Sequence, residues 1–145
     1  AGANGTNGAA GPPVCAHFQM LGNEAYKKGD FETAVGHFSK ALQACGGGGG
    51  GGKPQLFSNR SAAHLAMQSF DLALADAERC VEMKPKWGKA HSRRGNALHA
   101  LHRFIEAKEA YDKALELDPS NEVVQNSLKG LLQAMAMAPG GGGSL

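Results

Sequence analysis

The sequence predicts an all-α domain in which three helix-turn-helix repeats are stacked and a further helix caps the C-terminal end. Three segments share an aromatic residue followed three positions later by alanine, namely Phe31/Ala34, Phe70/Ala73 and Phe104/Ala107. The second and third of these segments are 34 residues apart, and the first lies 39 residues before the second. A proline follows the second and third phenylalanines by 15 residues, where it would end a helix because proline lacks the backbone N–H donor. Such a period is typical of helical pairs that stack side by side.

Each repeat is expected to form two amphipathic helices joined by a tight turn. The predicted pairs are 14–28 with 31–44, 54–67 with 70–83, and 87–101 with 104–117. The turns fall at Gly29-Asp30, Gln68-Ser69 and His102-Arg103, where Asp30 and Ser69 are predicted N-caps. Small residues at the helix contacts would let the backbones approach closely: Gly22, Ala34, Ala73, Gly95 and Ala107.

A seventh helix is predicted over residues 121–137. Its apolar residues recur at helical spacing, with Val124, Leu128, Leu131 and Met135 on one stripe and Leu132 beside it. A terminal repeat otherwise leaves apolar surface in water. This helix is therefore expected to cap the third repeat.

Glycine-rich segments mark the predicted limits of the domain. Residues 1–13 and 138–145 are expected to be disordered flanks of a domain that spans 14–137, with repeats at about 14–45, 53–85 and 86–119. The run Gly46–Gly52 is expected to be a flexible surface loop, because each glycine inside a helix costs about 1 kcal/mol relative to alanine.

Composition excludes several classes of protein. A formal net charge of +2 is too small to favour nucleic-acid binding, and no apolar run is long enough to cross a bilayer. The start of the sequence lacks the basic and apolar blocks of a signal peptide. Three widely spaced cysteines (Cys15, Cys45 and Cys80) suggest reduced thiols and a cytoplasmic location, with Cys80 acting as a small core residue.

The predicted repeat phase brings one polar and cationic set of side chains to a concave groove lined by the first helix of each repeat. The groove-facing residues are Gln19 and Asn23, then Asn59 and Ala62, then Lys89, Arg93 and Asn96. None of them is acidic, although the chain has 13 Asp and Glu residues. Amides and an ammonium ion can bind one carboxylate, and a guanidinium can hold a second acidic group through a forked hydrogen bond.

Three segments resemble the carboxylate-clamp tetratricopeptide domains of co-chaperones: Gly22-Asn23, Ser58–Ala63 (SNRSAA) and Trp87–Arg93 (WGKAHSR). The resemblance implies a right-handed superhelical stack. It also implies that five side chains grip the C-terminal aspartate of a chaperone tail that ends in Glu-Glu-Val-Asp. Four of the five match Asn23, Asn59, Lys89 and Arg93. The fifth is a lysine in the family and is Gln19 in this chain, which removes one full charge.

The resemblance predicts a non-catalytic co-chaperone module that binds the acidic C-terminal peptide of the seventy- or ninety-kilodalton heat-shock chaperones, with no cofactor. A general scaffold that binds internal acidic segments in the same groove remains an alternative, and blocking the terminal carboxylate of the peptide would separate the two. No catalytic or metal site is expected. His99 and His102 lie at i, i+3 but form no His-Glu-x-x-His motif, and the chain has no Cys-x-x-Cys pair. Nucleic-acid and membrane partners are not expected.

Overall fold

The structure, a computed structural model, describes residues 13–46 and 53–138 of the chain. This part of the chain folds into seven α-helices: α2 (Pro13–Lys27), α3 (Phe31–Gly46), α4 (Pro54–Ala66), α5 (Phe70–Met83), α6 (Gly88–Ala100), α7 (Phe104–Leu117) and α8 (Glu122–Met137). Every helix begins and ends within two residues of the range predicted from the sequence. The all-α prediction is therefore confirmed.

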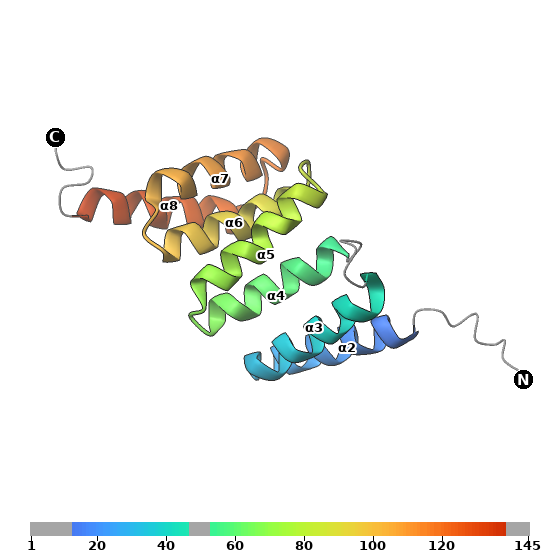
Figure 1. Cartoon of the computed structure of the whole chain (residues 1–145). Coiled ribbons are helices and arrows are strands. Elements are labelled where there is room, and N and C mark those ends of the chain that lie inside the picture. Colours follow the sequence, from blue (N-terminus) through green and yellow to red (C-terminus); the bar gives the residue numbers. More distant parts are fainter. Residues whose placement is uncertain (1–12, 47–52, 139–145) are drawn as a thin grey trace, which may run out of the picture.

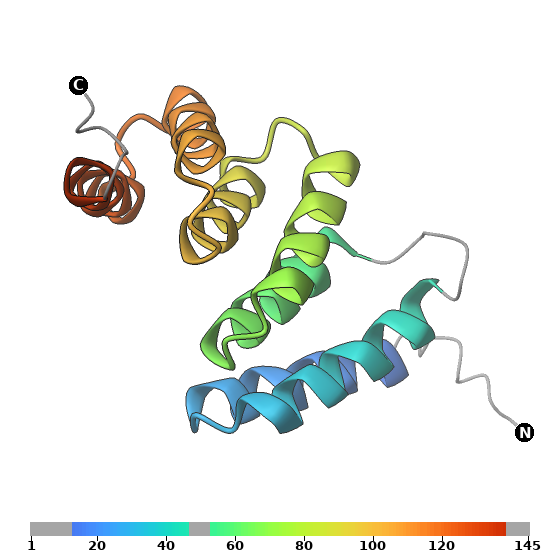
Figure 2. The same ribbon diagram turned by 60° about the vertical axis from the view of Figure 1, so that its left-hand side comes forward.

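The helices stack in chain order as three antiparallel pairs with α8 as a cap. Helix α2 packs against α3, α4 against α5, and α6 against α7, and each pair also contacts the next. Helices α2 and α8 lie at opposite ends of the stack (Figure 1). Figure 2 shows that successive pairs turn relative to one another, so that the stack curves. The first helices of the pairs, α2, α4 and α6, follow one another along one side of the curve, and α4 contacts both of the others.

The turn inside each pair has the same backbone geometry. Gly29, Gln68 and His102 adopt positive φ angles of 82°, 63° and 62°. In each turn the next backbone N–H reaches back to a carbonyl of the first helix at 2.9 Å, as Asp30 N does to Ala25 O. This arrangement satisfies carbonyls that the end of the helix leaves unpaired. Glycine adopts the left-handed conformation freely, whereas glutamine and histidine do so at a cost of about 1 kcal/mol.

Of the two predicted N-caps, one forms a capping hydrogen bond and the other does not. The Asp30 carboxylate accepts a hydrogen bond from Thr33 N at 3.2 Å, as predicted. Ser69 occupies the N-cap position of α5, but its side chain makes no capping hydrogen bond, so that prediction is wrong. Asn121 caps α8, because its side-chain oxygen accepts a hydrogen bond from Val124 N at 3.1 Å.

Two glycines allow the helices of a pair to approach closely. A Cβ atom at Gly22 would lie 2.5 Å from Phe38 Cε1, and one at Gly95 would lie 2.7 Å from Tyr111 Cδ1. Both aromatic rings are almost fully buried. In each case a ring from the second helix occupies the space that the missing side chain leaves on the first, as the predicted role of small residues requires.

The buried apolar residues form two clusters. One belongs to the first repeat and α4, and the other joins the second and third repeats to α8. Val124 and Leu131 of α8 are buried in the second cluster, and Leu128 and Met135 pack against it, so the capping role is confirmed. Leu132 is 44% exposed and lies outside this contact.

The cysteines differ from the sequence prediction. Cys15 of α2 and Cys45 of α3 are paired as a disulfide, with their Cα atoms 5.4 Å apart, whereas the sequence suggested reduced thiols. Cys15 lies at the start of α2 and Cys45 at the end of α3, and the antiparallel packing of this predicted helix pair brings the two ends together. Cys80 is a free, buried thiol that donates to Pro54 O at 3.3 Å, and burial raises its pKa to about 12.

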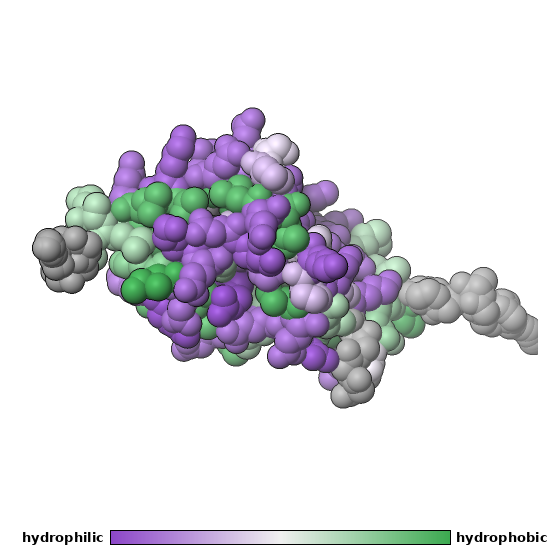
Figure 3. Space-filling model, turned by 90° about the horizontal axis from the view of Figure 1, so that it is seen from above, coloured by the Kyte–Doolittle hydropathy of each residue, from purple (hydrophilic) through white to green (hydrophobic). Residues whose placement is uncertain are grey.

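Most of the predicted flanks and of the glycine run lie outside the described residues. Two positions differ from the prediction, because Pro13 begins α2 and Gly46 ends α3. Within the described ranges, no helix combines the length and apolarity needed to span a bilayer. The face shown in Figure 3 is mostly hydrophilic, and its hydrophobic residues gather in separate patches.

Candidate functional site

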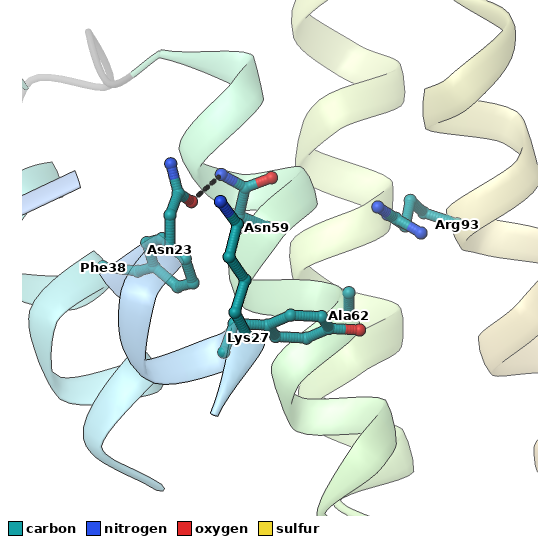
Figure 4. Close-up of a pocket in the computed structure, with 7 residues that line it drawn as sticks. Asn23, Lys27, Phe38, Asn59, Ala62 and Arg93 are labelled. Carbon is teal, nitrogen blue, oxygen red and sulfur yellow. Dashed lines mark hydrogen bonds between the residues drawn. The ribbon is translucent and has the colours of Figure 1, made fainter. Parts of the chain in front are cut away.

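A cavity of about 210 Å³ opens between the first helices of the three repeats. Figure 4 shows side chains from α2, α4 and α6 around it. The lining residues are Asn23, Tyr26, Lys27, Phe38, Asn59, Ala62 and Arg93. We call this cavity the amide pocket.

Two side-chain amides meet at one edge of the amide pocket. Asn59 Nδ2 donates to Asn23 Oδ1 at 3.2 Å, and Gln55 Nε2 donates to Asn59 Oδ1 at 2.7 Å. The dashed line in Figure 4 marks the bond between the two asparagines. Each asparagine carries an NH₂ group with two donors. Rotation of these amides can therefore present several N–H groups to a carboxylate that enters the pocket.

Arg93 of α6 faces the amides from the other side of the pocket (Figure 4). Its Nε donates to Ser58 Oγ at 3.0 Å, and Ser58 is fully buried. Burial lowers the pKa of Arg93 below its ordinary value, but arginine remains protonated at neutral pH. Within the described ranges Arg93 forms no ion pair with a carboxylate. The guanidinium is thus held in place by Ser58, while its charge is available to an acidic ligand.

Lys27 is a second cation on the amide pocket, and the sequence analysis did not identify it. It lies in the last turn of α2, four residues after Asn23, and its side chain is exposed. Residues at i and i+4 share one face of a helix. That spacing was the available signal for Lys27, whereas the resemblance points only to the residue four positions before Asn23. Tyr26 also lines the pocket and was missed in the same way.

The pocket brings together four of the seven predicted groove residues: Asn23, Asn59, Ala62 and Arg93. Gln19 is half-buried one turn before Asn23 and does not line the pocket. Lys89 is exposed one turn before Arg93 and lies outside it as well.

Asn96 faces a second cavity, of about 410 Å³, that extends from α4 to α8. Its Oδ1 accepts a hydrogen bond from Tyr111 Oη at 2.7 Å. Burial raises the pKa of Tyr111 to about 12, so its hydroxyl stays protonated at neutral pH. Asn96 therefore positions a core tyrosine and is separate from the amide pocket.

A partly buried ion pair anchors the helix that carries Asn59 to its neighbours. Arg60 Nε donates to Asp76 Oδ2 at 2.8 Å, and Arg60 Nη2 donates to Asp76 Oδ1 at 2.7 Å. Arg60 Nη1 also donates to Ser39 Oγ at 2.9 Å. Asp76 is 5% exposed, so this forked pair links α3, α4 and α5 in the interior.

The described residues contain no group of three or more His, Cys, Asp or Glu residues able to hold a metal ion. His64 lies near Asp76, with 3.8 Å between His64 Nε2 and Asp76 Oδ2. Burial lowers the pKa of this histidine. At neutral pH the ring is therefore mostly uncharged, and it does not line the amide pocket.

Residues 88–121 match the tetratricopeptide repeat family. The chain is 43% identical to the Hsp70-Hsp90 organizing protein of Triticum aestivum over 118 residues, which cover 81% of this chain and 19% of that protein. The first three curated relatives are matched over only 19%, 21% and 29% of their own lengths.

Two solved structures match nearly their whole length. The first TPR domain of human RPAP3, determined by NMR, has a TM-score of 0.79 and 32% identity, covering 87% of this chain and 95% of that one. The first TPR of Spaghetti (RPAP3) bound to the HSP90 peptide SRMEEVD has a TM-score of 0.76 and 32% identity, covering 85% and 94%.

Proposed function

The chain belongs to the tetratricopeptide-repeat family, and from this premise we propose that it is a non-catalytic module that holds the acidic C-terminal tail of a heat-shock chaperone in the amide pocket. The tail would end in Glu-Glu-Val-Asp and would come from a seventy- or ninety-kilodalton chaperone. A similar domain, the first TPR of Spaghetti, has been solved with the HSP90 peptide SRMEEVD. We also propose that the domain spans residues 14–137 and that it acts in the cytoplasm, a location that rests on the proposed chaperone partner and no longer on reduced cysteines.

The observation that carries this proposal is the chemistry of the pocket lining. Two amides and two cations converge on one cavity, and neither Lys27 nor Arg93 forms an ion pair with a carboxylate in the described part of the chain. Charged groups at a partly buried surface are stabilised by a partner of opposite charge. An acidic ligand would supply that partner.

Four of the lining residues fit particular parts of such a tail. Asn23 and Asn59 would donate to the terminal carboxylate. The guanidinium of Arg93 would bind a second acidic group, since arginine matches carboxylates in a forked geometry. Ala62 leaves space for an apolar side chain between them. Lys89, one helical turn from Arg93, lies outside the cavity and would add attraction at longer range.

Calorimetric titration with the peptide SRMEEVD tests the proposal. Arg93→Ala should weaken binding by about 1–3 kcal/mol, as for the loss of a charge-assisted hydrogen bond. Arg94→Ala is the matched control. Arg94 is the neighbouring arginine, but it pairs with Glu78 at 3.6 Å and does not line the pocket. Thermal unfolding of both variants separates lost binding from lost structure. Equal affinity of the Arg93→Ala variant and the unmodified protein would contradict the assignment.

One observation favours the alternative, a scaffold for internal acidic segments. Residue 19 is a neutral glutamine that does not line the pocket, so it brings no charge to a chain end. An internal segment needs no such charge. The two functions differ in whether the terminal carboxylate of the peptide is required.

A further inference from the structure

The two cations of the amide pocket are held very differently. Arg93 approaches from α6, and Ser58 fixes its guanidinium at 3.0 Å. Lys27 approaches from α2, the same helix as Asn23, and is exposed. Its flexible four-carbon stem lets the ammonium ion reach several positions around the amides. In Figure 4 the Lys27 side chain extends toward the edge of the pocket where Asn23 and Asn59 meet.

The position of Lys27 on its helix suits a carboxylate bound at the two asparagines. Four residues correspond to about 6 Å along a helix axis, which is within the reach of a lysine side chain. Lys27 and Asn23 also share one face of α2. An ammonium ion beside two amide donors provides one full charge and up to three N–H groups for the same carboxylate.

A lysine in the last turn of a helix can also be explained by the helix dipole, because a positive charge there is favourable. Lys28 shares that explanation. It follows directly in the sequence, is exposed and does not line the pocket. The dipole effect acts with or without ligand, whereas a contact with the ligand changes affinity only when the ligand's carboxylate is present. The two roles can therefore be separated by experiment.

We propose that Lys27 supplies the positive charge for the terminal carboxylate of the ligand at Asn23 and Asn59, and so decides whether this domain prefers chain ends. This inference rests on the proposed function. The inference gives to Lys27 on α2 the role of the positive charge that the resemblance assigned to Lys89 on α6. It requires no cation at position 19.

The test compares Lys27→Gln with Lys28→Gln in calorimetric titrations with SRMEEVD, as the free acid and with an amidated C-terminus. Lys27→Gln should weaken binding of the free acid about fivefold and leave the amidated peptide unchanged. Lys28→Gln should change neither. Adding Gln19→Lys to the Lys27→Gln variant should restore most of the affinity, because position 19 lies one turn from Asn23 on its other side.

Three outcomes would overturn the inference: a Lys27→Gln variant that binds like the unmodified protein, a loss that is equal for the amidated peptide, or an equal loss in Lys28→Gln. If the unmodified protein binds both peptides equally, the capture of chain ends fails and the inference fails with it. If the unmodified protein prefers the free acid and Lys27→Gln keeps that preference, only the inference fails.

Discussion

Replacing Gly95 by alanine tests how closely α6 and α7 are packed. Alanine favours a helix over glycine by about 1 kcal/mol, so an open site would gain stability. At Gly95 the new Cβ would lie 2.7 Å from two atoms of the Tyr111 ring. That ring cannot move away easily, because it is 1% exposed and its hydroxyl donates to Asn96. Overpacking of this kind costs about 1–3 kcal/mol, and we expect a net destabilisation of about 1 kcal/mol.

Gly36→Ala is the matched control, since Gly36 lies inside α3 and nothing approaches its Cβ position within 4 Å. This variant should be stabilised by about 1 kcal/mol. Urea unfolding followed by circular dichroism at helical wavelengths measures both changes. The two substitutions are chemically identical, so opposite signs can come only from their surroundings. If Gly95→Ala stabilises the domain as much as Gly36→Ala does, the close contact between α6 and α7 is wrong.

Three further predictions follow from the ion pair, the groove and the cysteines. Asp76→Ala removes the carboxylate that pairs with the partly exposed Arg60 and should lower the free energy of unfolding by about 2 kcal/mol. A change below about 0.5 kcal/mol in urea unfolding would show that the pair is dispensable. Gln19→Lys should tighten binding of the free-acid SRMEEVD peptide about fivefold, and the gain should be larger at low salt, as calorimetric titrations at two ionic strengths would measure. An equal gain for the amidated peptide would argue against chain-end capture. Thiol titration of the denatured protein should find one thiol before reduction and three after, because Cys15 and Cys45 are paired; three thiols before reduction would contradict the pairing.

The fold could be predicted from the sequence because the same residue pattern recurs in all three repeats and predicts the same pair of helices each time. The 34-residue spacing of Phe70 and Phe104 sets the phase. Small residues such as Gly22 and Gly95 then mark where a ring must enter, and the structure places Phe38 and Tyr111 there. The capping residues at the helix starts were predicted less reliably. Asp30 and Ser69 have similar capping propensities, yet only Asp30 makes the bond, because side-chain orientation depends on the turn as a whole.

The site was less predictable because it is formed between helices. The repeat phase places Lys89 and Arg93 on the same face of α6, but it does not say how far each lies from α2. Arg93 reaches the pocket because Ser58 of α4 holds it, a contact between residues 35 positions apart in the sequence. The phase alone also could not decide whether residue 19 or residue 27 approaches the asparagines. Both share a face with Asn23, and only the packing of α2 on α4 distinguishes them.

The central claim is that this pocket captures the end of an acidic chain, and one comparison tests it most directly. The unmodified protein is titrated by calorimetry with SRMEEVD as the free acid and as the C-terminal amide, at the same pH and ionic strength. The proposed function predicts that amidation weakens binding at least about tenfold, or about 1.4 kcal/mol, since the carboxylate that the two asparagines would hold is gone. Equal affinity for the two peptides would contradict the claim and would identify the pocket as a site for internal acidic segments.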